Sequence, residues 1–141
     1  MQDPRAGRLR NRLLTVLYWM VALMIGLGAF GHGFVGVKPV RAALDTVTLP
    51  SDVREVIWIV WYFVSGCMLT FSLLILLAWF AARRGHSNAF AGPMVIAIFW
   101  MATGIASFAV QQNPFWLLFF AEGLGLLCAS YGLQRSQLHN D

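Results

Sequence analysis

Four long apolar runs constrain this chain more than any other feature of its sequence. The helices that these runs predict cover residues 13–37, 55–82, 89–110 and 114–133. At about 1.5 Å per helical residue, each helix reaches or exceeds a hydrocarbon core of about 30 Å. Backbone polar groups inside lipid must be satisfied within their own segment, which requires helices. The sequence therefore predicts an all-α integral membrane protein, with four transmembrane helices in one antiparallel bundle and a single domain.

The composition excludes an ordinary soluble domain. Hydrophobic residues make up 59% of the chain and charged residues only 11%, whereas soluble domains carry about 25% charged residues. The first apolar run exceeds the 7–15 residues of a secretory h-region, so we expect a retained helix. The formal charge of +4 comes largely from arginines next to this run, which is typical of a cytoplasmic anchor held by anionic lipid. Nucleic acid is not an expected partner.

The distribution of basic residues predicts the orientation. The Lys38–Arg54 stretch between the first two runs carries three of the ten Lys and Arg residues, and the other seven lie in the two tails and in the loop after the second run. Because the more basic side faces the cytoplasm, both termini are predicted to be cytoplasmic. In a bacterium this corresponds to a multi-pass protein of the inner membrane. The seven basic residues on the cytoplasmic side are Arg5, Arg8, Arg10, Arg12, Arg83, Arg84 and Arg135.

The connections between the runs also contain local signals. Pro39 followed by Val40, Ala43, Leu44 and Val47 predicts a short amphipathic helix in the first external loop. Ser51 is an expected N-cap of the second span, and Asn113-Pro114 are expected to start the fourth. Only residues 111–113 separate the last two runs, which predicts a tight antiparallel hairpin.

Glu122 is the principal candidate for ligand binding or proton handling. It lies near the middle of the fourth run, and the only other acid within the predicted helices is Glu55, at the first position of the second helix. An acid at the centre of a membrane helix costs roughly 2.5–3.5 kcal/mol on insertion scales, so it normally faces the protein interior. The two hypotheses are a hydrogen bond to a neighbouring helix and a role in proton or ligand chemistry. Its candidate partners are Thr103 and Ser107 on the third span, and Ser65, Thr70 or Ser72 on the second. Trp100, a further candidate of the site, lies on one helical stripe with Thr103 and Ser107.

His32 is a second candidate, near the outer end of the first run. An imidazole suits a metal, a haem or a pigment, but the other histidines, His86 and His139, lie in cytoplasmic segments. We therefore expect a hydrogen-bonded histidine near the interface. Cys67 and Cys128 belong to no metal-binding motif and are expected to pack as small apolar residues. No metal site and no resident cofactor are predicted.

Small residues predict where helices approach one another. Short side chains at helical spacing allow close packing in lipid, although bare backbone in the first run also suits a groove for a lipid tail or cofactor ring. In the fourth run, small residues follow Glu122 on the same helical face. The predicted packing positions are Gly26, Ala29, Gly33, Gly125 and Ala129.

Three functions are compatible with these features. The first, which we favour, is an accessory or structural subunit of a larger membrane complex. The second is a proton- or cation-coupled carrier that works as an oligomer through Glu122. The third is a membrane protein that binds lipid, quinone or pigment. No nucleophile–base set or metal-binding motif is visible at membrane depth, so an enzyme is not expected.

Overall fold

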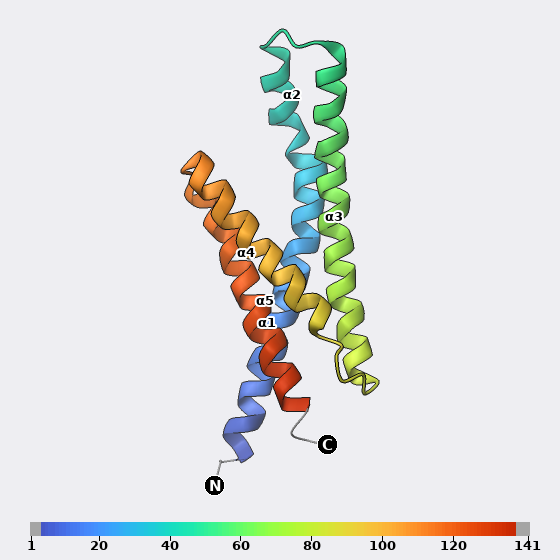
Figure 1. The fold of residues 1–141 in the computed structure, drawn as a ribbon, viewed down its shortest axis with the longest axis vertical. Helices are drawn as coiled ribbons and strands as arrows, with labels where there is room; N and C mark the ends of the chain where they lie inside the picture. The colour runs from blue at the N-terminus through green and yellow to red at the C-terminus, as the bar shows by residue number, and fades with distance from the viewer. Residues whose placement is uncertain (1–3, 138–141) are drawn as a thin grey trace. The chain divides into compact units, whose positions relative to one another are not determined.

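Helices account for nearly all of residues 4–137, the part of the chain that the computed structural model describes. No strand occurs between these residues. His139 and the other terminal residues lie outside the described range. The elements, shown in Figure 1, are α1 (Pro4–Phe30), the π turn η1 (Gly31–Val35), α2 (Val37–Asp45), α3 (Ser51–Arg83), α4 (Ala91–Gln111), the 3₁₀ turn η2 (Pro114–Trp116) and α5 (Leu117–Gln137).

Within residues 4–137, four helical segments are long and apolar enough to cross a membrane. They are Gly7–Asp45, Ser51–Arg83, Ala91–Gln111 and Pro114–Gln137. This confirms the prediction of an all-α chain with four apolar helices of spanning length. The structure supports a multi-pass membrane protein.

The helix boundaries differ from the predicted boundaries at several ends. The helix α1 begins at Pro4, well before Leu13, because arginine and leucine are good helix formers and charge ends a membrane span without ending a helix. At the start of α3, the Pro50 carbonyl accepts a hydrogen bond from Arg54 N at 3.1 Å. Ser51, the expected N-cap, is therefore the first helical residue, a difference within the usual uncertainty of helix ends.

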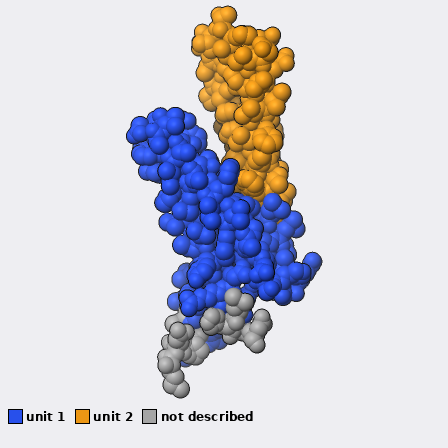
Figure 2. All heavy atoms as spheres, in the orientation of Figure 1, with its two compact units in different colours: residues 1–22, 74–141 blue, residues 23–73 orange. Residues whose placement is uncertain are grey.

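The chain divides into two compact units (Figure 2). Among the described residues, unit 1 comprises residues 4–22 and 74–137, and unit 2 comprises residues 23–73. Each unit is described by itself below.

Unit 1 is built around the pair α4 and α5 and the adjoining parts of α1 and α3. Tyr18 is fully buried, and its hydroxyl donates to the Ile75 carbonyl at 2.6 Å. The ring of Tyr18 meets Phe90 edge-on at 5.4 Å between centroids, and Leu126 is also fully buried. This buried tyrosine has the partner that its hydroxyl requires.

A short turn connects α4 to α5. Gln112 has a left-handed backbone with φ of 53°, and its N–H donates to the Phe108 carbonyl at 2.8 Å. The side chain of Asn113 accepts from Phe115 N at 3.0 Å, with Pro114 as the next residue. The helical C-cap at Gln112 and the following N-cap at Asn113 are the only two residues between α4 and η2, and they begin the hairpin that α4 and α5 form.

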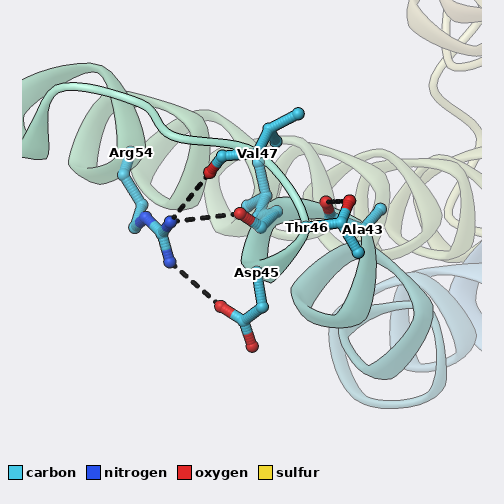
Figure 3. A network of polar contacts seen from close by, with 6 residues as sticks. Ala43, Asp45, Thr46, Val47 and Arg54 are labelled. Atoms are coloured by element: carbon cyan, nitrogen blue, oxygen red, sulfur yellow. Dashed lines mark hydrogen bonds and ion pairs between the residues drawn. The ribbon is translucent and has the colours of Figure 1, made fainter.

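Unit 2 contains the connection from α2 to α3. The guanidinium group of Arg54 holds this connection in place, as Figure 3 shows. Arg54 Nη1 pairs with Asp45 Oδ1 at 3.0 Å, and Nη2 donates to the carbonyl oxygens of Leu44 at 3.1 Å and Val47 at 3.5 Å. Because it joins the end of α2 to the first turn of α3, Arg54 closes the connecting loop. The short helix predicted from Pro39 onward is present as α2. It begins earlier, at Val37, so that only Gly36 separates it from η1.

Candidate functional site

The principal polar contact of unit 1 joins α4 to α5. Trp100 Nε1 donates to Glu122 Oε2 at 2.8 Å. Trp100 is only 4% exposed, and Glu122 is half-buried. Glu122 lies roughly two turns from the start of the apolar helical segment Pro114–Gln137, and about one turn before its midpoint. The acid therefore faces a neighbouring helix, and its partner there is an indole.

Two glycines hold the backbones of α4 and α5 together around this pair. A Cβ on Gly123 would lie 2.7 Å from the Ala97 carbonyl oxygen and 2.9 Å from Met101 N. A Cβ on Gly104 would lie 2.7 Å from Phe120 N. Neither position has space for a side chain, since the opposing atoms belong to the backbone. The close approach of the helices at these glycines brings Trp100 within reach of Glu122.

Aromatic side chains cover the Trp100 ring on the α5 side. Phe119 lies 5.3 Å from Trp100 between ring centroids, and Trp116 lies 5.3 Å from Phe119. Trp116 Nε1 donates to Gln111 Oε1 at 3.1 Å in an exposed position. The acid is thus held beside a largely apolar aromatic cluster.

The Trp100–Glu122 contact is compatible with either protonation state of the acid. Indole nitrogen is a donor only, so Oε2 must be the acceptor. A proton on the other carboxyl oxygen leaves this hydrogen bond intact. The arrangement therefore serves equally as a structural contact and as a holder for an acid that exchanges a proton.

A second polar cluster lies in unit 2, where the π turn η1 meets α3. His32 Nδ1 lies 2.9 Å from Ser65 Oγ, and the imidazole stacks on Trp61 with 3.9 Å between centroids. Trp61 Nε1 donates to the His32 carbonyl at 3.0 Å. In the π turn, Gly36 N bonds to Gly31 O at 2.9 Å, and this shifted pattern makes the His32 carbonyl available to Trp61. We call His32, Trp61 and Ser65 the His32 cluster.

The hydrogen bonds of Ser65 indicate the tautomer of His32. The Ser65 hydroxyl donates to the Trp61 carbonyl at 3.2 Å, and a hydroxyl has one proton to donate. Nδ1 of His32 is then the donor to Ser65 Oγ, and Nε2 of the neutral ring keeps its lone pair. The side chain has the hydrogen-bonded environment that the sequence led us to expect.

The other polar candidates are described within their own units. Thr103 Oγ1 donates to the carbonyl of Phe99 at 2.9 Å, and Ser107 is half-buried on α4. Ser65 and Ser72 belong to unit 2. Between residues 4 and 137, no group of three or more His, Cys, Asp or Glu side chains is placed to hold a metal ion. Cys67 and Cys128 are free cysteines, half-buried and exposed respectively.

The small residues of the sequence prediction occupy two different contacts. In unit 2, a Cβ on Gly26 would lie 2.7 Å from Ser72 Oγ, and one on Gly33 would lie 3.3 Å from Ser65 Oγ. Side chains of α3 therefore occupy the space beside these two glycines. Ala29 is buried. In unit 1, Ala129 is fully buried, and a Cβ on Gly125 would lie 3.4 Å from Leu17.

Sequence reasoning missed three residues that shape these sites. Gly104 and Gly123 make closer backbone contacts than Gly125, and Trp61 binds His32. A usable signal for Gly104 was its position one turn after Trp100, on the same helical face. No comparable signal existed for Trp61, because its contact with His32 depends on how η1 packs against α3.

No protein-family model matches the chain, and neither a curated protein nor a solved structure shows significant similarity to it.

Proposed function

We propose that this chain inserts into a membrane through its four long helices, with both termini cytoplasmic, and acts as an accessory or structural subunit of a larger membrane complex. The observation that carries the proposal is the internal use of the polar groups in its spans. Glu122 accepts from Trp100, and His32 bonds to Ser65 and stacks on Trp61. Polar groups that are occupied in this way serve as contacts between helices.

The outward faces of the helices support the same proposal. On α4 and α5, large apolar side chains point away from the unit 1 core. An apolar face of this kind suits lipid tails or the helices of another membrane protein, since both present apolar atoms. The exposed residues on these helices include Val95, Ile98, Phe99, Ile105, Leu118, Leu124 and Tyr131.

The orientation rests on the bias in basic residues. Seven of the ten Lys and Arg residues lie in the first turns of α1, at the junction of α3 and α4 and near the end of α5, and positively charged segments of this kind remain in the cytoplasm. The loop between α2 and α3 is then external, together with the Arg54 contacts that close it.

Photo-crosslinking in native membranes tests the subunit role. A photoreactive amino acid replaces Ile98, which is 58% exposed, or Ile96, which is 7% exposed, on the same helix. We expect position 98 to give one reproducible adduct with another membrane protein, and position 96 to give none. Mild-detergent purification should then retain that protein in a fixed ratio. Adducts only to lipid, together with purification of a lone monomer or dimer, would contradict the proposal.

A carrier that uses Glu122 is the second candidate. The specific observation in its favour is an acid that is half-buried within a candidate membrane span. Intramembrane acids often belong to proton relays. The Trp100 contact tolerates a change of protonation on the other oxygen, so it is compatible with this role. The Glu122→Gln variant described in the Discussion separates the two candidates.

A further inference from the structure

The N-terminal part of α1 carries a shallow, open hollow with an apolar lining, which Arg10 joins through the apolar part of its exposed side chain. Its lining consists of four leucines and one arginine, and its volume is about 420 Å³. Leu9 and Leu13 are 60% and 62% exposed. The lining residues are Leu9, Arg10, Leu13, Leu14 and Leu17.

Helical spacing explains why one arginine belongs to the hollow and its neighbours do not. Arg10, Leu14 and Leu17 follow the i, i+4, i+7 pattern of one helical face. Arg12 is two residues from Arg10, so it projects about 200° away around the helix. Arg10 and Arg12 are both exposed, and they differ chiefly in whether an apolar surface lies beside them.

The contacts of α5 place another cation at the level of Arg10. A Cβ on Gly132 would meet Leu14 at 2.6 Å, and one on Gly125 would meet Leu17 at 3.4 Å. Later residues of α1 therefore lie beside earlier residues of α5, so the two helices are antiparallel. Continuing this register by one turn brings Arg135 to the level of Arg10.

The charge at this end of unit 1 has one sign among the residues that the structure describes. The seven basic residues of unit 1 are all arginine and all exposed, and Glu122 is the single acid between residues 4–22 and 74–137. The planar guanidinium of arginine matches the geometry of a phosphate group through paired hydrogen bonds. An arginine beside a leucine-lined hollow combines a phosphate-binding group with an apolar surface.

We propose that this hollow is a binding site for an anionic phospholipid, with the phosphate at Arg10 and an acyl chain along the leucines. The inference rests on the membrane insertion proposed above, but not on the subunit role. A polybasic segment beside a membrane span attracts anionic lipid in general. The hollow adds a specific place for one lipid molecule.

The test is a titration of the purified protein in neutral detergent with dioleoyl-phosphatidylglycerol, followed by native mass spectrometry. We expect Arg10→Gln to weaken lipid binding about tenfold, because a charge-assisted contact is lost. Leu13→Trp, which fills the hollow, should weaken it similarly. Arg12→Gln is the matched control, with the same loss of charge on the opposite face, and it should bind as the parent does. Dioleoyl-phosphatidylcholine should bind weakly to all four proteins.

Several outcomes would overturn the site. Equal losses in Arg10→Gln and Arg12→Gln would indicate diffuse attraction between charges. Full competition by inorganic phosphate would indicate an ion site without an acyl chain. A protein adduct from a photoreactive residue at position 13 in native membranes would assign the hollow to a polypeptide. Thermal unfolding of each variant confirms that it is folded. If the protein binds lipid normally but a photoreactive residue at position 98 gives no protein adduct, only the subunit role is contradicted.

Discussion

The indole nitrogen of Trp100 donates a hydrogen bond to the Glu122 carboxyl across 2.8 Å, and so joins α4 to α5. The two residues are far apart in the sequence, and the α4–α5 turn brings them together. Gly104 and Gly123 keep the two backbones close enough for the contact to form. This pair is the clearest polar feature of unit 1, and it supplies the sharpest prediction.

Trp100→Phe should destabilise the protein by about 1–3 kcal/mol, because the carboxyl loses its buried donor. The matched control is Trp116→Phe, which removes an indole bonded to Gln111 in an exposed position. Thermal unfolding in detergent measures both variants. If Trp116→Phe loses as much stability as Trp100→Phe, the hydrogen bond to Glu122 contributes no more than one in an exposed position.

Glu122→Gln should fold normally, since the amide oxygen still accepts from Trp100. Glu122→Ala should lose stability, because the Trp100 N–H is left without this acceptor. The same proteins are then placed in liposomes and assayed for pH-dependent movement of protons or cations. We expect no flux from the parent protein. A parent flux that Glu122→Gln abolishes without loss of folding would favour the carrier and contradict a purely structural role.

Gly123→Ala and Gly104→Ala should each cost roughly 1–3 kcal/mol, because the new Cβ meets backbone atoms that move only with their helix. Gly92→Ala is the control on α4. It has nothing within 4 Å of the new Cβ, so it should be neutral or stabilise by about 0.5–1 kcal/mol.

Gly125→Ala should be milder than Gly123→Ala, whereas Gly125→Leu should push α5 away from Leu17 and Val21. Melting temperatures rank the variants. If Gly123→Ala melts at the same temperature as the parent, the close backbone contact at Gly123 is contradicted.

Trp61→Phe should loosen the π turn in unit 2, because the His32 carbonyl loses the indole donor. Amide hydrogen exchange across residues 31–36 should become faster, while thermal stability falls by about 1–3 kcal/mol. Trp58→Phe provides the same chemical change on the same helix, at a position that faces Arg41. Equal exchange rates in the two variants would argue against the His32 cluster as the anchor of the turn.

The orientation is tested by labelling single cysteines. Cys67 and Cys128 are first replaced by Ala, and a cysteine is then introduced at Thr46 or Ser87, both of which are exposed. A membrane-impermeant thiol reagent added to intact cells should label position 46 and spare position 87. Labelling of both positions in lysed cells is the control for reactivity. The reverse pattern in intact cells would place both termini outside.

The sequence predicted most of the helical framework, because long apolar runs report the solvent around them. It was less informative about where the helices end. The arginines before Leu13 mark the edge of the apolar run, yet α1 continues through them to Pro4. The same applies after residue 133, where α5 continues to Gln137.

The sequence by itself determined the helical class, the number of candidate spans and the candidates Glu122 and His32, since these follow from composition, spacing and the cost of polar groups in lipid. Only the tertiary structure decided that Glu122 bonds to Trp100, that His32 bonds to Ser65 and stacks on Trp61, and that Gly104 and Gly123 carry the α4–α5 contact. The reason is physical. Apolarity is a property of one residue and is visible in its neighbours along the chain, whereas a hydrogen bond between helices depends on the rotation and register with which two helices pack.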